Sequence, residues 1–534
     1  MKISITNLII PINKNQNESI YNEIEKLGIQ SKEIKELKFS KRSIDSRKKN
    51  EIKFVYNIEI EVNDCCQIPK KENIKIVTEQ TTAPRIATFD LNAKIAVIGT
   101  GPAGLFAAYS LCKYGYKPII FERGESVEDR DISIEKFIKT SQLNPNSNIQ
   151  FGEGGAGTYS DGKLNTRIKS GYINEVFEIL LECGAQEQIS WDYKPHIGTD
   201  VLKTVITNLR NKIIALGGVF HFNSLLTDIK VSNGSIESID ITELDKSSIN
   251  PQLKVTNYKV DKLILAIGHS ARDTYRMLHK NNIFMENKPF AVGARIEHPR
   301  EFIDKLMFGK EYQNDLLGSA TYSLTYNNKE ENRGVFSFCM CPGGVIVNAA
   351  SQEGGTLVNG MSYSDRKRPF SNSALVVAVK ENEFGDHLFS GMEFQEMIER
   401  KAYKMGGGYT GIFQNTIDFI NDKPSSKPLD SSYEMKLTPS NLNELFPKFI
   451  TDNMKSALNH WNTIYKGFVS ESANLIGPET RTSAPVRIVR DNFGESINAK
   501  GIFPIGEGAG YAGGITSAAV DGLKIVDLSF TKEV

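Results

Sequence analysis

The sequence predicts an α/β protein of several domains, and three observations lead to this fold class. Residues 95–123 read as a strand, a glycine turn, a helix and a second strand. A similar strand, glycine turn and helix return at 501–527. With 534 residues, the chain exceeds the roughly 250–300 residues at which a single hydrophobic core stops growing. We therefore expect a discontinuous Rossmann-like domain with an inserted α+β domain and a small N-terminal α+β domain.

The expected domain boundaries follow from changes in this pattern. Residues 1–83 are predicted to form an N-terminal accessory domain, and 283–480 a substrate or cap domain. The dinucleotide-binding domain combines 84–282 with 481–534. Within the first domain, apolar and alternating residues predict four elements, a strand at 3–10, a helix at 18–27 and strands at 34–39 and 52–62.

A basic segment lies between the last two of these strands. Residues 38–53 carry seven Lys and Arg residues against Asp45 and Glu51. We interpret this segment as a basic loop that is able to hold RNA or a phosphate-bearing ligand, with a solvated turn as the commoner alternative. No aromatic-rich RNA-binding signature accompanies it.

Each glycine of the turn in 95–123 has its own expected task. Gly99 makes the tight turn, and Gly101 lets the backbone approach a pyrophosphate. Gly104 lets the helix pack closely on the strand. The pyrophosphate is expected on the free N–H groups of the helix N-terminus, next to Pro102 and Ala103.

The second strand ends on an acid at a spacing typical of nucleotide recognition. Glu122 lies eighteen residues beyond Gly104, close to the roughly 20-residue offset expected for a carboxylate on a ribose hydroxyl. We place Arg123 in the same site. Because a strand, a helix and an acid accompany the glycines, a nucleotide site is favoured over a structural turn.

Two further segments are expected to reach this site. The stretch FGEGGAGTYSDGKLNTR is rich in glycine and carries Lys163 and Arg167, which indicates backbone near a flat or anionic group; a surface loop is the alternative. A helix at 199–216 and a strand at 219–229 follow. A buried strand at 263–267 then ends towards the ligand. The candidate cofactor residues here are Gly154, Gly155, Ala156 and Gly268.

The expected cap domain, 283–480, alternates strands with isolated helices. Gly406, Gly408 and Gly411 spell a second dinucleotide pattern, but the preceding FQEMIERKAYKM reads as a helix. Because the pattern requires a strand at that place, we reject it as a nucleotide site.

The C-terminal stretch GIFPIGEGAGYAGGITSAAVDGLKIVD repeats the first pattern. A short strand ends on Gly506 and Glu507, and a helix is expected to begin near Gly513, Gly514 and Ile515. Such a helix N-terminus stabilises a nearby negative charge, and a plain helix cap is the alternative.

Composition limits the partners and the compartment. Lys plus Arg and Asp plus Glu both number 64, so no overall charge attracts nucleic acid or an anionic membrane. The apolar segment 3–10 is too short to span a bilayer and has no cleavage site, and we expect a cytoplasmic protein without a metal site. The cysteines show no disulfide framework. Cys341 is the candidate for redox chemistry, and the commoner alternative is that it is a buried structural residue. They are Cys65, Cys66, Cys112, Cys183, Cys339 and Cys341.

Together these blocks resemble flavoproteins of the glutathione-reductase superfamily. The resemblance implies that GTGPAG and Glu122 hold the ADP half of FAD, that LILAIG is the middle signature, and that PIGEGAG contacts the ribityl chain. It also implies adenine contact near Leu226 and a reduced, anionic flavin stabilised by the helix at Gly514. Glu507 departs from the superfamily, which usually has Asp there.

More narrowly, five blocks look like the FAD-dependent dehydrogenase family, also called NAD(FAD)-utilising dehydrogenases, which has no settled substrate. They are FGEGGAGTYSDGKLNTR, KPHIGTD, FCMCPGG, NGMS and ETRTSAPVRI. The resemblance covers nearly the whole chain, including the N-terminal module.

The resemblance implies an FAD-dependent oxidoreductase that transfers hydride through flavin N5, with NAD(P)H as a transient co-substrate and a small-molecule substrate. His196 and His269 lie beside expected cofactor loops and are candidate acid–base groups, with structural histidines as the alternative. Two rival functions stay open, a flavin monooxygenase and an RNA-associated flavoprotein that uses residues 38–53.

Overall fold

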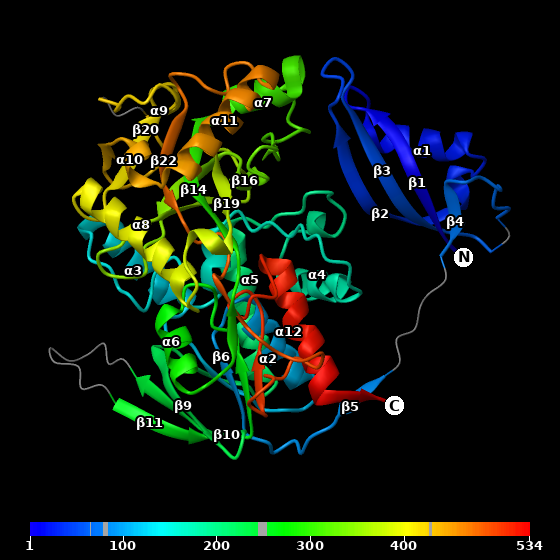
Figure 1. Cartoon of the computed structure of the whole chain (residues 1–534). Coiled ribbons are helices and arrows are strands. Elements are labelled where there is room, and N and C mark those ends of the chain that lie inside the picture. Colours follow the sequence, from blue (N-terminus) through cyan, green and yellow to red (C-terminus); the bar gives the residue numbers. More distant parts are fainter. Residues whose placement is uncertain (65, 78–83, 244–253, 427–429) are drawn as a thin grey trace.

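The computed structural model describes residues 1–64, 66–77, 84–243, 254–426 and 430–534. A four-stranded, a five-stranded and a seven-stranded sheet dominate the structure (Figure 1). Within these residues, no helix has the length and apolar character needed to cross a membrane.

The N-terminal sheet has the antiparallel order β2-β3-β1-β4. Every second side chain of β3 is buried, as the alternation of FVYNIEIEV predicts, and Ile20 and Ile24 of α1 belong to the same core. The predicted strands and helix are confirmed, although β2 is longer than expected. The elements are β1 (Lys2–Pro11), α1 (Gln16–Lys26), β2 (Ile34–Asp45), β3 (Lys53–Val62) and β4 (Ile74–Ile76).

The longer β2 strand shows that the prediction of one basic loop over 38–53 is wrong. Residues 38–45 pair with β3, because the half-buried positions of β2 continue to Asp45, and only 46–52 form the hairpin tip. Arg42 forms a salt bridge of 3.2 Å with Asp192, and Arg47 one of 2.7 Å with Asp45. These basic side chains therefore have acidic partners within the chain.

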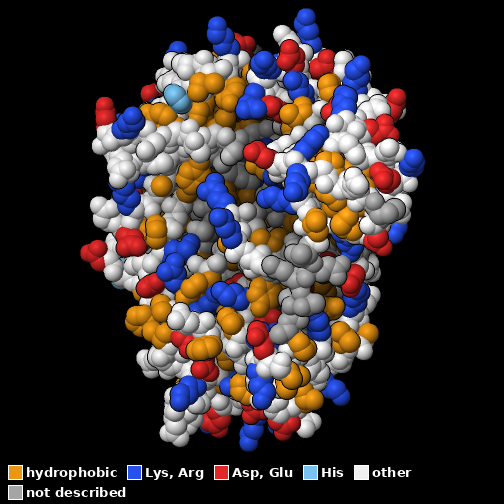
Figure 2. Space-filling model, turned by 90° about the vertical axis from the view of Figure 1, so that its right-hand side faces the viewer, with side chains coloured by type: hydrophobic (Ala, Val, Ile, Leu, Met, Phe, Trp, Pro, Cys, Tyr) orange, Lys and Arg blue, Asp and Glu red, His pale blue; other side chains and the backbone are white. Residues whose placement is uncertain are grey.

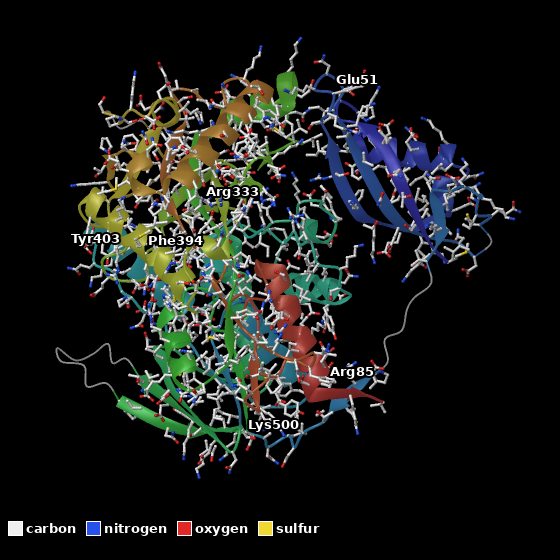
Figure 3. All side chains as sticks on the ribbon, viewed as in Figure 1. Glu51, Arg85, Arg333, Phe394, Tyr403 and Lys500 are labelled. Atoms are coloured by element: carbon white, nitrogen blue, oxygen red, sulfur yellow. The ribbon has the colours of Figure 1, made fainter. Side chains whose placement is uncertain are left out.

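The N-terminal sheet contacts the rest of the protein through β2 and the hairpin tip. Arg42 N donates to Trp191 O at 2.6 Å, and Tyr193 N donates to Arg42 O at 2.8 Å. The Arg42 guanidinium lies 4.6 Å from the centroid of the Trp191 ring. Figure 3 shows Glu51 at the tip of the hairpin. The edge of the first sheet is thus bound to segment 191–193 by backbone and side chains.

The five-stranded sheet is parallel and has the order β24-β12-β6-β7-β8. The predicted strand at 263–267 is confirmed as β12, which is buried between β6 and β24. Strand β24 and helix α12 come from the C-terminal part of the chain. The elements around this sheet are β5 (Arg85–Ala87), β6 (Ile95–Ile98), α2 (Pro102–Lys113), β7 (Ile119–Phe121), α3 (Val127–Thr140), α4 (Tyr172–Glu182), α5 (Thr199–Ala215), β8 (Val219–His221), β12 (Lys262–Leu265), α6 (Arg272–Lys280), β24 (Ile502–Pro504), α12 (Ile515–Phe530) and β25 (Thr531–Glu533).

A three-stranded antiparallel sheet, β11-β10-β9, lies beside it. The single strand predicted at 219–229 is wrong, because Asn223 has φ 53° and turns the chain from β8 into β9 of the other sheet. Residues 244–253 are not among the residues that the structure describes. The strands are β9 (Ser224–Ser232), β10 (Ser235–Glu243) and β11 (Lys254–Lys259).

The seven-stranded sheet has the order β15-β16-β19-β14-β22-β20-β21. Helix α8 ends at Gly406, where the rejected glycine pattern begins, so the predicted helix before it is confirmed. The elements of this region are β13 (Met285–Asn287), β14 (Phe290–Pro299), α7 (Arg300–Phe308), β15 (Thr325–Asn328), β16 (Arg333–Cys341), β17 (Gly344–Asn348), β18 (Val358–Ser362), β19 (Phe370–Val379), α8 (Ser390–Gly406), β20 (Gly411–Asn415), α9 (Thr416–Ile420), β21 (Leu437–Pro439), α10 (Leu442–Leu445), α11 (Lys448–Ile464), β22 (Asn474–Glu479) and β23 (Val486–Ile488).

Candidate functional site

A cavity of about 740 Å³ is lined by residues of both the five-stranded and the seven-stranded sheet regions. This volume lies within the range of roughly 300–1,000 Å³ that is typical of small-molecule sites. Residues of the first glycine turn lie in the same wall as the loop after β24 and the start of α12. Strand β16 of the seven-stranded sheet contributes a further part of the lining.

The glycines before α2 have separate structural reasons. Gly99 has φ 95°, and a Cβ there would lie 2.4 Å from the Ala266 carbonyl oxygen. A Cβ on Gly104 would lie 2.0 Å from the Gly99 carbonyl oxygen, so Gly104 permits close packing and does not line the cavity. A Cβ on Gly101 would meet only the Cα of Gly155, at 3.9 Å. Gly101 therefore leaves open space where its backbone reaches the cavity.

A second helix also begins at the cavity. Gly514 is the N-cap of α12 and no side chain caps the helix. A Cβ on Gly513, Gly514 or Gly268 would meet no atom within 4 Å, and all three residues line the cavity. Helix α2 begins there as well, next to Pro102 and Ala103, without a side-chain cap. Two helix N-termini with open glycine backbone suit an anionic dinucleotide such as FAD.

Glu122 lines the cavity, but its carboxylate is occupied by the protein. One oxygen accepts hydrogen bonds from the backbone N–H of Thr100 at 2.8 Å and from its hydroxyl at 2.7 Å. The other accepts from Gly124 N at 3.0 Å and from Gly152 N at 3.1 Å. Four donors use the acceptor positions of a carboxylate. In this structure Glu122 holds the glycine turn against the following loops, and the predicted ribose contact has no vacant acceptor.

Of the other predicted cofactor residues, some line the cavity and others only allow close packing behind it. Arg123 lines the cavity and stacks 4.0 Å from the centroid of the Phe151 ring. A Cβ on Gly154 would lie 2.0 Å from Thr158 Oγ1, and one on Gly506 would lie 2.6 Å from Ala103 Cβ. Gly154 and Gly506 therefore serve packing and lie outside the lining. The remaining residues, Gly155, Ala156, Leu226 and Ile515, line it.

Glu507 projects its carboxyl group into an environment that disfavours ionisation. Burial raises the pKa of Glu507 to about 7, against a smaller opposite effect of Lys288. The residue lines the cavity together with Gly513 and Gly514. A carboxyl with this pKa changes its charge near neutral pH, next to the start of α12.

Replacing Glu507 with Gln is expected to stabilise the protein without cofactor more at pH 8 than at pH 5. Because the folded-state pKa is raised to about 7, wild-type protein loses stability as the pH rises from the usual value of 4.5 through 7. Gln cannot ionise, so the variant avoids this loss. Thermal unfolding of both proteins, freed of cofactor, measures the difference at each pH. A difference that is equal at the two pH values would contradict the raised pKa.

The structure separates the two predicted histidines. His269 lines the cavity, its Nδ1 lies 2.9 Å from Ser270 Oγ, and burial followed by Arg481 lowers the pKa of His269 to about 3. It is therefore a neutral imidazole near pH 7. His196 lies outside the lining, with Nε2 3.2 Å from Ser364 O, and burial lowers its pKa. Only His269 has the position to contact a ligand.

Cys341 lies in the cavity wall and is bonded within the protein. Its side chain is buried, the Sγ atom donates to Cys339 O at 3.3 Å, and Arg295 Nη1 approaches the sulfur at 3.6 Å. Cys339 is exposed and has φ 42° at a β-bulge of β16. The structure thus places Cys341 beside a cationic group at the cavity.

Three buried ion pairs at the cavity were absent from the sequence prediction. Arg295 Nε donates to Glu479 at 2.7 Å, Arg366 Nε to Asp161 at 2.9 Å, and Arg481 Nη2 to Glu399 at 2.8 Å. One signal was present in the sequence, because Arg295 interrupts the apolar run FAVGARI of a strand. A buried charge of this kind requires a partner and marks a candidate site.

The fold and the cavity define a mixed α/β protein with a Rossmann-like dinucleotide domain. The family model described as NAD(P)-binding Rossmann-like domain matches residues 97–127, and that described as FAD-dependent protein, C-terminal domain-like, matches 289–482. A domain of unknown function matches 2–61.

An uncharacterised protein of Clostridium beijerinckii is 43% identical over 539 residues, which is 99% of this chain and 98% of that protein. The chain belongs to the same family as that protein, and the match to the FAD-dependent domain lies in its residues 289–482.

Solved structures of flavin enzymes are more distant. Quinol fumarate reductase FrdA of E. coli is 10% identical, with 82% of this chain and 69% of that chain covered and a TM-score of 0.36. The halogenase PltM is 8% identical over 81% of this chain and 67% of that chain, with a TM-score of 0.37. CtdE in complex with FAD is 11% identical over 81% of this chain and 82% of that chain, with a TM-score of 0.30. At such scores these likenesses do not indicate an activity for this chain.

Proposed function

We propose that the protein is an oxidoreductase that holds FAD, accepts electrons from NAD(P)H and transfers hydride to or from a small-molecule substrate. One observation carries the proposal most directly. The N-termini of α2 and α12 open onto a single cavity that continues to β16, in a chain of an FAD-dependent family. When bound, FAD supplies a hydride donor and acceptor at N5.

The residues of the chain have distinct tasks in this proposal. The backbone of Gly101 to Ala103 binds the pyrophosphate at the start of α2. The start of α12 at Gly514 stabilises negative charge on the bound ring system. We assign this binding to 84–282 with 481–534, and the orientation of the substrate to 283–480.

His269 acts in this proposal as a hydrogen-bonding group. Its low pKa keeps the imidazole neutral at pH 7, so it has no proton to give as a strong acid. Glu507, with a pKa near 7, is the better group to hold or release a proton in the same cavity. His196 has a positioning role in this proposal, with its Nε2 at 3.2 Å from Ser364 O.

Anaerobic stopped-flow reduction of the purified, FAD-loaded protein tests the proposal. We expect NADH or NADPH to bleach the yellow flavin absorbance in the absence of oxygen. Steady-state assays with oxygen, with analysis of products, serve as the second arm. Failure of both nicotinamides to reduce the flavin would contradict the NAD(P)H link, and a hydroxylated product formed with oxygen would support the monooxygenase instead.

A further inference from the structure

The part of the cavity away from the glycine turns carries an excess of positive charge. Its lining holds six cationic side chains but only two carboxylates, and one of the six, Arg481, is paired with Glu399 outside the lining. Arg295 is bound to Glu479, and Arg366 to Asp161. The remaining cations, Lys163, Arg167 and Lys194, are called the cationic cluster below. On the face shown in Figure 2, Lys and Arg side chains gather around a hollow near the middle of the molecule.

The members of the cationic cluster have donors to spare. Lys163 shares Asp161 with Arg366, at 2.8 Å, and donates to the Met340 carbonyl. Lys194 donates to Thr321 Oγ1 at 2.9 Å and makes no ion pair within the described ranges. Arg167 is exposed, and in the part of the chain that the structure covers it has neither an ion pair nor a side-chain hydrogen bond. Most of the N–H donors of Lys194 and Arg167 therefore remain for a ligand.

Lys163 and Arg366 lie close enough to Lys194 to disfavour its charged form. Burial, and then the charges of Lys163 and Arg366, lower the pKa of Lys194. Like charges that face one cavity without a matching number of carboxylates raise the free energy of the empty site and concentrate anions there. A bound anion would relieve this repulsion through charge-assisted hydrogen bonds.

The same region offers a hydroxyl group without a partner and an apolar surface. The Tyr322 side chain is 7% exposed and lines the cavity, and its hydroxyl makes no hydrogen bond within the described residues. The nearby Ser373 hydroxyl donates to the Phe338 and Ala374 carbonyls. Phe338 and Met340 are further residues of the same lining. The wall therefore suits an organic body that ends in an acceptor group.

We infer that the substrate is an organic anion with a carboxylate group, which the cationic cluster binds while Phe338 and Met340 contact its apolar body. This inference rests on the proposed oxidoreductase function, because it names the substrate class of that site. Lys194 and Arg167 are the binding residues for the carboxylate, and Lys163 completes the positive field. If these three cations were only a solvated surface, the protein would bind a carboxylate compound and its uncharged analogue with equal affinity.

Titration of the FAD-loaded protein with benzoate and with benzamide tests the inference without turnover. Both probes have an aromatic body, but only benzoate is charged at pH 7. We expect benzoate to perturb the flavin absorbance spectrum. We expect benzamide to bind at least about tenfold more weakly than benzoate. In Lys194→Gln and Arg167→Gln, benzoate affinity is expected to fall by about tenfold or more, while FAD stays bound. Equal binding of the two probes would overturn the inference.

Lys169→Gln is the matched control, since Lys169 is exposed, lies two residues from Arg167 and does not line the cavity. It removes the same charge from the same loop and is expected to leave benzoate affinity unchanged. An equal loss of affinity in all three variants would show a general charge effect and overturn the assignment.

The reduction assay separates this inference from the proposed function. If the nicotinamides fail to reduce the flavin but benzoate binds as expected, the function fails and the anion site stands. If Lys194→Gln weakens reduction by NADPH but leaves both reduction by NADH and benzoate affinity unchanged, the cations bind the 2′-phosphate of NADPH. That result would overturn the inference and leave the oxidoreductase in place.

Discussion

The Gly101→Val variant is expected to lose bound FAD while its circular dichroism stays close to that of the wild type. A Cβ at this position meets only Gly155 Cα at 3.9 Å, so the protein itself has room for the first added atom. The further methyl groups extend into the space that a pyrophosphate would need at the start of α2. A loss of affinity of about 1.4 kcal/mol or more, at least roughly tenfold, is expected. Acid extraction of flavin and fluorescence titration with FAD measure it.

Gly171→Val is the control for this prediction. Gly171 lies at the start of α4, has no atom within 4 Å of an added Cβ, and is not part of the cavity lining. The control introduces the same side chain and is expected to keep its FAD. Full occupancy in Gly101→Val would show that the cofactor does not lie over this turn.

The second large effect is expected on stability. Glu399 is buried between Arg272 and Arg481, and its two oxygens accept hydrogen bonds from both guanidinium groups at 2.8–3.0 Å. Glu399→Gln keeps the size of the side chain but removes the carboxylate that both guanidinium groups share, and Glu396, 3.7 Å from Arg272, is the carboxylate that remains beside them. Breaking a buried ion pair in this way costs about 3–5 kcal/mol. For a domain of about 150–250 residues, this cost is expected to lower the thermal midpoint by roughly 6–20 °C.

Glu135→Gln is the control for the stability experiment, because Glu135 forms an exposed pair with Lys139 at 3.0 Å. Such surface pairs contribute about 0–1 kcal/mol.

The two arginines hold the pKa of Glu399 well below its usual value of 4.5. The stabilisation is therefore present above pH 4.5 and is lost as the pH falls towards the folded-state pKa. A variant as stable as the control at pH 7 would contradict the role of this cluster.

The glycine turn shows what could be predicted from neighbouring residues alone. The task of Gly104 depends on the Gly99 carbonyl oxygen, five residues earlier in the chain, and that of Gly99 on its own φ of 95°. Local patterns of this kind carry their own geometric requirement, because a positive φ or a close approach excludes a side chain. The elements β6, α2, β7 and α12 were predicted for the same reason.

Predictions that depended on more than local pattern were less complete. Glu122 was predicted from its spacing, but its hydrogen bond from Gly152 N comes from a loop 30 residues further on that the spacing does not describe. The basic segment 38–53 was interpreted from charge, although Arg42 has its acidic partner 150 residues further on. A run of basic residues in a sequence does not reveal whether an acidic side chain from elsewhere in the chain pairs with it in the folded protein.

The sequence by itself determined the dinucleotide motif and the resemblance to FAD-dependent proteins, since contiguous residues encode both. Only the tertiary structure showed which residues of the middle region reach the cavity. Arg295 and Glu479 are 184 residues apart, and Asp161 and Arg366 are 205 apart. These distant side chains meet because sheet pairing brings β14 beside β22 and folds the segment after β18 onto the loop at 160–167. The excess positive charge of Lys163, Arg167 and Lys194 can be recognised only after those pairs are known. Each pair already uses one of the carboxylates that line this part of the cavity.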